Sequence, residues 1–125
     1  MKTIILIVQI LVAIAFVMAG SMKIFTPYED LVLMKNMDWA KDFSSTQITI
    51  IGILEILGGL GLVFPMALKK INFLIPLAAL GLVLTMIGAI IMHIGREEPI
   101  IVNLVFLLLP LSVAYFKRNL ILKKP

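Results

Sequence analysis

Four long apolar segments constrain the fold of this 125-residue chain more than any other feature. They cover approximately residues 3–25, 46–64, 73–94 and 99–116. A helix needs about 20 apolar residues to cross ~30 Å of hydrocarbon, and each segment is close to that length. Because a bilayer offers the backbone no hydrogen-bond partners, we expect all four to be helices. The sequence therefore predicts an all-α membrane protein with a single domain, 1–125, that forms an antiparallel bundle of four transmembrane helices.

The composition excludes several classes of function. The chain is 62% hydrophobic and 14% charged, whereas soluble domains are ~25% charged. It contains no cysteine, which removes disulfides, thiol redox chemistry and cysteine ligands. His93 is the single histidine, so we expect no metal site. The net charge of +4 comes from charges at the ends of apolar segments, so the expected partner is the lipid bilayer and not nucleic acid.

The connection after the first apolar segment carries the signals of an interfacial segment over about 27–43. Residues 26–29 match a capping box with proline at the first helical position, which predicts a short helix over 27–36. Trp39 suits the membrane–water interface. Residues 44–47 match a second capping box, at the start of the next span. The first apolar segment is longer than the ~7–15 residues of a signal-peptide core, so we expect it to be retained as a helix.

The charges predict how the helices are oriented. One end of the predicted bundle has only basic residues, namely Lys2, Lys69, Lys70, Lys117, Arg118, Lys123 and Lys124. The other end has four basic residues and six acidic ones, namely Lys23, Lys35, Lys41, Arg96, Glu29, Asp30, Asp38, Asp42, Glu97 and Glu98. By the positive-inside rule the first end is cytoplasmic. We therefore expect a bacterial inner-membrane protein with both termini in the cytoplasm.

Small residues indicate where helices approach closely. The second span contains Gly52, Gly58, Gly59 and Gly61, and the third has a stripe of Ala78, Gly81, Thr85 and Gly88. In lipid, small residues favour helix contact because they allow the backbones to approach each other. We expect the glycine face of the second span to pack on the stripe of the third. The alternative is a glycine-lined wall that leaves room for a flat ligand.

Four polar residues fall in the outer half of the predicted bundle: Lys23, Glu55, His93 and Asn103. Glu55 lies roughly 12 Å below the outer surface at ~1.5 Å per helical residue. A charge at such depth costs at least ~2.5–3.5 kcal/mol, so Glu55 needs a partner, and Lys23, His93 and Asn103 are the candidates. Each residue also has a purely structural interpretation. Lys23 is then a snorkelling lysine, and Glu55 is a buried carboxyl group that makes a structural hydrogen bond. His93 is an interfacial cap, and Asn103 makes an interhelical amide contact.

Several of these motifs together resemble the DoxX-like family of small four-helix membrane proteins. They are AGSMKI at 19–24, GILEILGGLGLVFP at 52–65, GAIIMH at 88–93, and Asn103. The resemblance implies that Lys23, Glu55, His93 and Asn103 form a polar centre. Similar proteins include a membrane subunit of an archaeal thiosulfate:quinone oxidoreductase, members of bacterial oxidative-stress complexes, and an animal protein that assists receptor assembly.

These observations lead to two functional hypotheses. The first is an accessory membrane subunit of redox metabolism that binds a quinone-like lipophile, without a covalent cofactor, at the four polar residues. The second is a non-catalytic scaffold or assembly subunit, joined to other membrane subunits or to further copies of itself. A proton-coupled transporter is the third alternative, although the chain shows no inverted repeat. The sequence assigns no catalytic residue and leaves open whether the protein is an enzyme.

Overall fold

The computed structural model describes residues 2–122, so Lys123 and Lys124 of the predicted cytoplasmic end lie outside the described residues. The long helices are α1 (Lys2–Phe25), α3 (Ser45–Val63), α4 (Leu74–Gly95) and α5 (Ile101–Phe116). Shorter helices are α2 (Tyr28–Leu31) and α6 (Asn119–Leu122), with 3₁₀-helices η1 (Asp38–Asp42), η2 (Phe64–Ala67) and η3 (Lys69–Ile71). All regular structure within residues 2–122 is helical, which confirms the all-α prediction.

The long helices begin and end within two residues of the predicted spans. By length and composition, three of them can cross a membrane: α1, α4, and α3 together with its extension through Ala67. The fourth, α5, is equally apolar but has only 16 residues, or ~24 Å of helix. It starts at Ile101 because the chain first turns through Glu97, whose φ is 57°. Proline at position 99 therefore precedes the helix instead of opening it.

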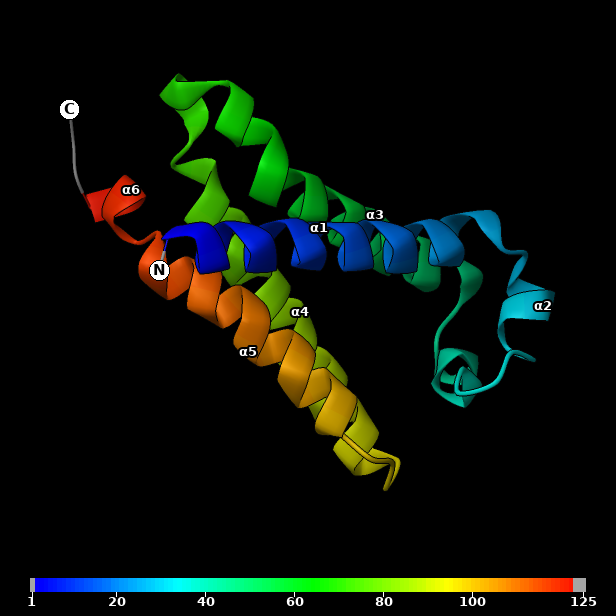
Figure 1. The fold of residues 1–125 in the computed structure, drawn as a ribbon. Coiled ribbons are helices and arrows are strands. Elements are labelled where there is room, and N and C mark those ends of the chain that lie inside the picture. The colour runs from blue at the N-terminus through cyan, green and yellow to red at the C-terminus, as the bar shows by residue number, and fades with distance from the viewer. Residues whose placement is uncertain (1, 123–125) are drawn as a thin grey trace.

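The long helices form two pairs (Figure 1). In one pair α1 lies along α3 and runs in the opposite direction, and in the other α4 lies along α5 in the same manner. The two pairs are close together near the N-terminus and diverge toward the end that carries α2 and the α4–α5 turn. The apolar core fills the closed end, with Phe16 of α1, Leu62 of α3, Leu82 of α4 and Val113 of α5 all buried. The open end is where a cavity can form between the pairs.

The connection between α1 and α3 folds into its own small cluster and corrects one prediction. The predicted helix over 27–36 ends at Leu31, and Asn36 has a φ of 66°, which breaks any helix. The chain turns there so that Leu31 and Ala40, both with 0% exposure, pack together. The capping box predicted at 26–29 is also wrong, because Pro27 is the N-cap and makes no side-chain bond.

The second predicted capping box is confirmed at the start of α3. The backbone N–H of Gln47 donates to Ser44 Oγ at 3.1 Å, and the backbone N–H of Ser44 donates to Gln47 Oε1 at 2.9 Å. These bonds satisfy two amide groups that would otherwise lack an acceptor at the helix start. They fix the first turn of α3, and thereby the rotation of the helix that carries Glu55.

The glycines of α3 lie on two faces of the helix, one against α1 and one against α4, and this corrects the predicted packing. A Cβ atom on Gly52 would lie 2.7 Å from the Gly20 carbonyl oxygen, and one on Gly59 would lie 2.9 Å from the Ala13 oxygen. Gly52 and Gly59 therefore contact α1, not α4 as predicted. They share that face because seven residues are two turns of a 3.6-residue helix. Gly58, however, does face α4, where its added Cβ would lie 2.8 Å from Leu82 Cγ.

The stripe on α4 is mostly unused in packing. An added Cβ on Gly81 or Gly88 would meet nothing within 4 Å, so the packing role predicted for both glycines is wrong. The reason is that the two helix pairs diverge and leave this face of α4 without a neighbour. Of the predicted stripe, Ala78 alone meets a glycine of α3, since a Cβ on Gly61 would lie 2.7 Å from Ala78 Cβ.

We predict opposite effects for two glycine-to-alanine substitutions. Gly52→Ala forces a methyl group against the Gly20 backbone, which cannot rotate away, and should lower the unfolding free energy by about 1–3 kcal/mol. Gly81→Ala adds the same methyl group in open space and should leave stability unchanged or raise it by up to about 1 kcal/mol. Unfolding of the two variants in mild detergent measures this difference. Equal effects would mean that the α1–α3 contact is not as close as described.

Candidate functional site

A buried ion pair joins α1 to α3. Lys23 lies in the last turn of α1, and its Nζ is 2.8 Å from Oε1 of Glu55 in α3. Their side chains are only 9% and 5% exposed. The glycine contact brings the partners within reach, because a Cβ on Gly52 would be 3.1 Å from Lys23 Cβ. The predicted partner of Glu55 is therefore present, and burial makes the pair stronger and less screened than an exposed one.

The ion pair does not use all of the polar capacity of Glu55. Nζ of Lys23 lies 2.8 Å from Oε1, and no other side-chain donor among residues 2–122 pairs with this carboxylate. A carboxylate has about four acceptor positions on its two oxygens. Glu55 is therefore able to accept a hydrogen bond from a further polar group.

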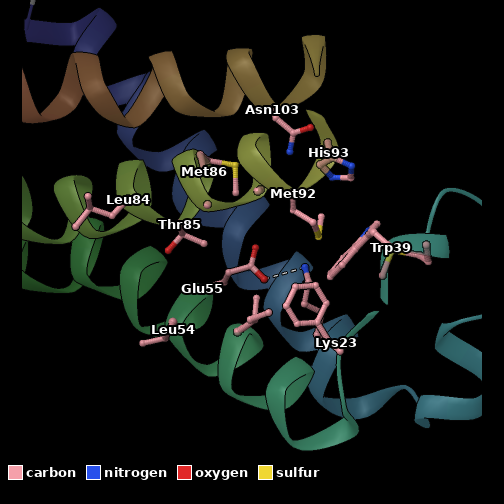
Figure 2. A pocket seen from close by; sticks show the side chains of 15 residues that line it. Lys23, Trp39, Leu54, Glu55, Leu84, Thr85, Met86, Met92, His93 and Asn103 are labelled. Carbon is pink, nitrogen blue, oxygen red and sulfur yellow. Dashed lines mark ion pairs between the residues drawn. The ribbon is translucent and has the colours of Figure 1, made fainter. Parts of the chain in front are cut away.

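Glu55 and Lys23 line a cavity of about 510 Å³ between the two helix pairs (Figure 2). His93 of α4 and Asn103 of α5 line the same cavity from the other side. The structure thus brings all four sequence-predicted residues to one space, from all four long helices. Most of the remaining lining is apolar and includes Leu54, Leu84, Met86 and Met92. Few polar groups in an otherwise apolar cavity are typical of small-molecule sites.

The open face of α4 forms part of the cavity wall. Gly88 and Thr85 line the cavity, and nothing lies within 4 Å of an added Cβ on Gly88. The Thr85 hydroxyl donates back to the Gly81 carbonyl at 3.0 Å, so it presents its methyl group rather than a free hydroxyl. Gly88 is the one glycine that lines the cavity among residues 2–122, so the glycines of α3 do not form a wall of it.

His93 is not a partner of Glu55. Its Nδ1 lies 2.8 Å from Oε1 of Glu98, which follows the turn at the end of α4. The imidazole packs edge-on against Trp39, with ring centroids 6.4 Å apart, and Lys23 Nζ lies 5.8 Å from the centroid of Trp39. Asn103 makes no side-chain hydrogen bond to the residues that the structure describes, so its amide is available in the cavity.

Residues of the α1–α3 connection complete the site and were not predicted as part of it. Met37, Trp39 and Phe43 line the cavity near its outer end. The sequence places Trp39 at the membrane interface, but it carries no signal that the connection folds back over Lys23. That placement depends on the turn at Asn36 and on the Tyr28 hydroxyl, which donates to the Phe43 carbonyl at 2.5 Å.

A second set of charges links the two helix pairs at the open end. Arg96 lies 2.5 Å from Oδ2 of Asp42 through one terminal nitrogen, and its Nε donates to Glu98 at 3.1 Å. The hydrogen bond with Asp42, more than the nearby carboxylate charges, raises the pKa of Arg96 above its ordinary value. Asp42 follows α2 and belongs to η1, whereas Arg96 follows α4. The Arg96–Asp42 bridge therefore connects the two pairs beside the cavity.

Within residues 2–122 there is no cluster of three or more His, Asp or Glu side chains with the geometry of a metal site. Glu55 has a cation partner rather than further carboxylates. The groups that line the cavity are suited to hydrogen bonding with an organic ligand.

The whole site falls within a recognised family match. A family model described as the DoxX-like family matches residues 7–114, which include Lys23, Glu55, His93 and Asn103. No curated protein and no solved structure shows significant similarity to the chain.

The buried ion pair should show strong coupling in a double-mutant cycle. Lys23→Met leaves the Glu55 carboxylate buried without its cation and should destabilise the protein by about 3–5 kcal/mol. Combining it with Glu55→Leu removes both charges and should restore most of that loss, because well-packed apolar pairs replace buried ion pairs at little cost. Unfolding titrations in detergent measure the three variants. Additive losses would show that the two side chains do not interact.

The Arg96–Asp42 bridge should limit access to the cavity. Because the chain has no cysteine, Met92→Cys places a unique thiol on the cavity wall. Adding Arg96→Gln should speed its labelling by a polar thiol reagent about two- to fivefold, the range expected for an exposed ion pair. Lys41→Gln is the matched control. It breaks the 3.2 Å ion pair between Lys41 and Asp38, which lies within η1 and does not connect the two helix pairs. An equal change in both would contradict this role of Arg96.

Proposed function

We propose that this protein, which belongs to the DoxX-like family, is an accessory membrane protein of redox metabolism that binds a quinone or a similar lipophile. The observation that carries the proposal is the Lys23–Glu55 ion pair on the wall of a mainly apolar cavity of about 510 Å³. Family membership and the apolar helices suggest an integral membrane protein. A quinone fits these conditions because it has a flat apolar ring with carbonyl groups at its edge.

The membrane arrangement follows from the helices. In our proposal α1, α3, α4 and α5 all cross the bilayer as an antiparallel bundle, and the short α5 is accommodated by local thinning of the bilayer. Lys69 and Lys70 in η3, with Lys117 and Arg118 after α5, support a cytoplasmic location for that end and for both termini. The cavity then lies in the outer half of a bacterial inner membrane.

Each polar group has a chemical role in this proposal. The Lys23 ammonium donates a hydrogen bond to a ligand carbonyl, and Glu55 accepts one from a hydroxyl at an acceptor position that Lys23 leaves free. Glu55 is also the group able to exchange a proton with the ligand. The amide of Asn103 both donates and accepts, and His93 contributes its Nε2 while Glu98 holds its Nδ1.

The test is to purify the protein in mild detergent, extract its lipids, and titrate it with an added quinone. We expect a quinone or another small lipophile to co-purify. Glu55→Gln keeps the shape of the side chain but removes its charge, and should weaken quinone binding about tenfold. The control is Ser112→Ala, since the Ser112 hydroxyl donates only to the Leu109 carbonyl and lies outside the cavity. Absence of any lipophile, together with unchanged quinone binding in Glu55→Gln, would overturn the proposal.

A scaffold or assembly subunit is the competing function, and the ion pair gives it specific support. Lys23 and Glu55 join α1 to α3 directly, so they can fix helix packing without touching a ligand. In that case Glu55→Gln should lower the amount of folded protein and leave any bound lipophile unaffected. Migration of the protein as part of a large complex on native gels, with these two results, would favour the scaffold.

A further inference from the structure

A second, smaller cavity lies on the other side of Glu55. Its volume is about 160 Å³, and it shares Glu55, Met86 and Asn103 with the larger cavity. Figure 2 shows these three side chains between α5 and α3. The residues that line only the smaller cavity are Ala15, Phe16 and Ala19 of α1 and Phe106 of α5. The two cavities are therefore neighbours that meet at two polar side chains.

The smaller cavity opens toward the outside of the bundle. Ala15, Ala19 and Phe106 are half-buried, whereas the neighbouring Met18 and Val102 are 67% exposed. Ala15 and Ala19 are four residues apart and lie on one face of α1, where their small side chains leave space. Phe16 meets Phe106 edge-on, with ring centroids 5.8 Å apart, and closes the space toward the core. What remains is a short groove between α1 and α5 that ends at Glu55 and Asn103.

We propose that this α1–α5 groove holds the first part of the apolar chain of the ligand. This inference rests on the proposed function, and it specifies an amphiphile with a hydrogen-bonding ring in the larger cavity and a single chain that leaves sideways into the bilayer. The polar groups Glu55 and Asn103 stand where the two spaces meet, so they contact the ring where its chain begins. Beyond them the groove is lined by Met86 and by alanine and phenylalanine side chains, which suits a hydrocarbon chain and no polar group.

The groove selects ligands by their shape and adds little affinity through the hydrophobic effect. The chain moves from lipid into an apolar groove, so little water is released and little affinity is added. A ligand with a long chain must nevertheless have a route for it into the bilayer, and the groove provides such a route past Glu55 and Asn103. Blocking the groove should therefore exclude long-chain ligands and spare ligands that consist of the ring alone.

The test compares two probes: a benzoquinone with a long isoprenoid chain, and the same ring with a methyl group in place of the chain. In Ala19→Leu and Ala15→Leu, affinity for the long-chain quinone should fall about tenfold or more, as expected for an overfilled space, while affinity for the short probe stays unchanged. Met18→Phe is the control, because it adds bulk on the same turn of α1 at an exposed position that lines neither cavity. It should bind both probes like the unmodified protein.

Each outcome is decisive. If the unmodified protein binds neither probe, the proposed function fails. If it binds both, and the Ala19→Leu and Ala15→Leu variants bind both equally well, the hydrocarbon chain of the ligand leaves by another route. The groove assignment then fails, while the proposed function stands. If an alanine variant loses the short probe as well, it has misfolded. A photoreactive group on the chain of the long probe then decides, because it must label α1 or α5 beside Ala15, Ala19 or Phe106 in the unmodified protein, and labelling elsewhere overturns the assignment.

Discussion

The close contact between α1 and α3 is the constraint on which the rest of the structure depends. Gly20 and Gly52 let the two backbones approach until no side chain fits between them. Lys23 follows Gly20 by one turn and Glu55 follows Gly52 by one turn, so the same contact places the two charges together. An unpaired carboxylate buried in this way would be expensive, and the pairing with Lys23 offsets part of that cost. The close packing at the two glycines therefore also determines where the two charges lie.

The cavity follows from how the two helix pairs meet. Each pair is closely packed within itself, and the core joins the pairs at one end only. At the other end the space between them is bordered by Trp39 and Phe43 of the α1–α3 connection. The Arg96–Asp42 bridge connects the pairs there without filling the space. A site of this kind combines rigid walls, provided by long helices, with a polar connection at its outer end.

Some of this organisation could be predicted from the sequence, and the reasons differ from residue to residue. The helix spans follow from apolar length, the start of α3 from the capping box at Ser44, and the pairing of Lys23 with Glu55 from their depth and opposite charge. The glycine assignment failed because the run over 52–61 spreads around α3, so it cannot pack on one neighbour. The partner of His93 could not be predicted, since Glu98 reaches it only through the left-handed turn at Glu97.

The charges of the site bear on which ligands suit it. Lys23 and Glu55 are both buried and oppose each other at 2.8 Å, so their combined charge on the cavity wall is close to zero. His93 is held by Glu98, whose charge is in turn shared with Arg96. A cavity balanced in this way offers no net attraction to a free ion. It offers instead a donor and an acceptor side by side, which is the arrangement that polarises the carbonyl and hydroxyl groups of a neutral molecule. These electrostatics support our proposal that the ligand is an uncharged polar ring and not an ion.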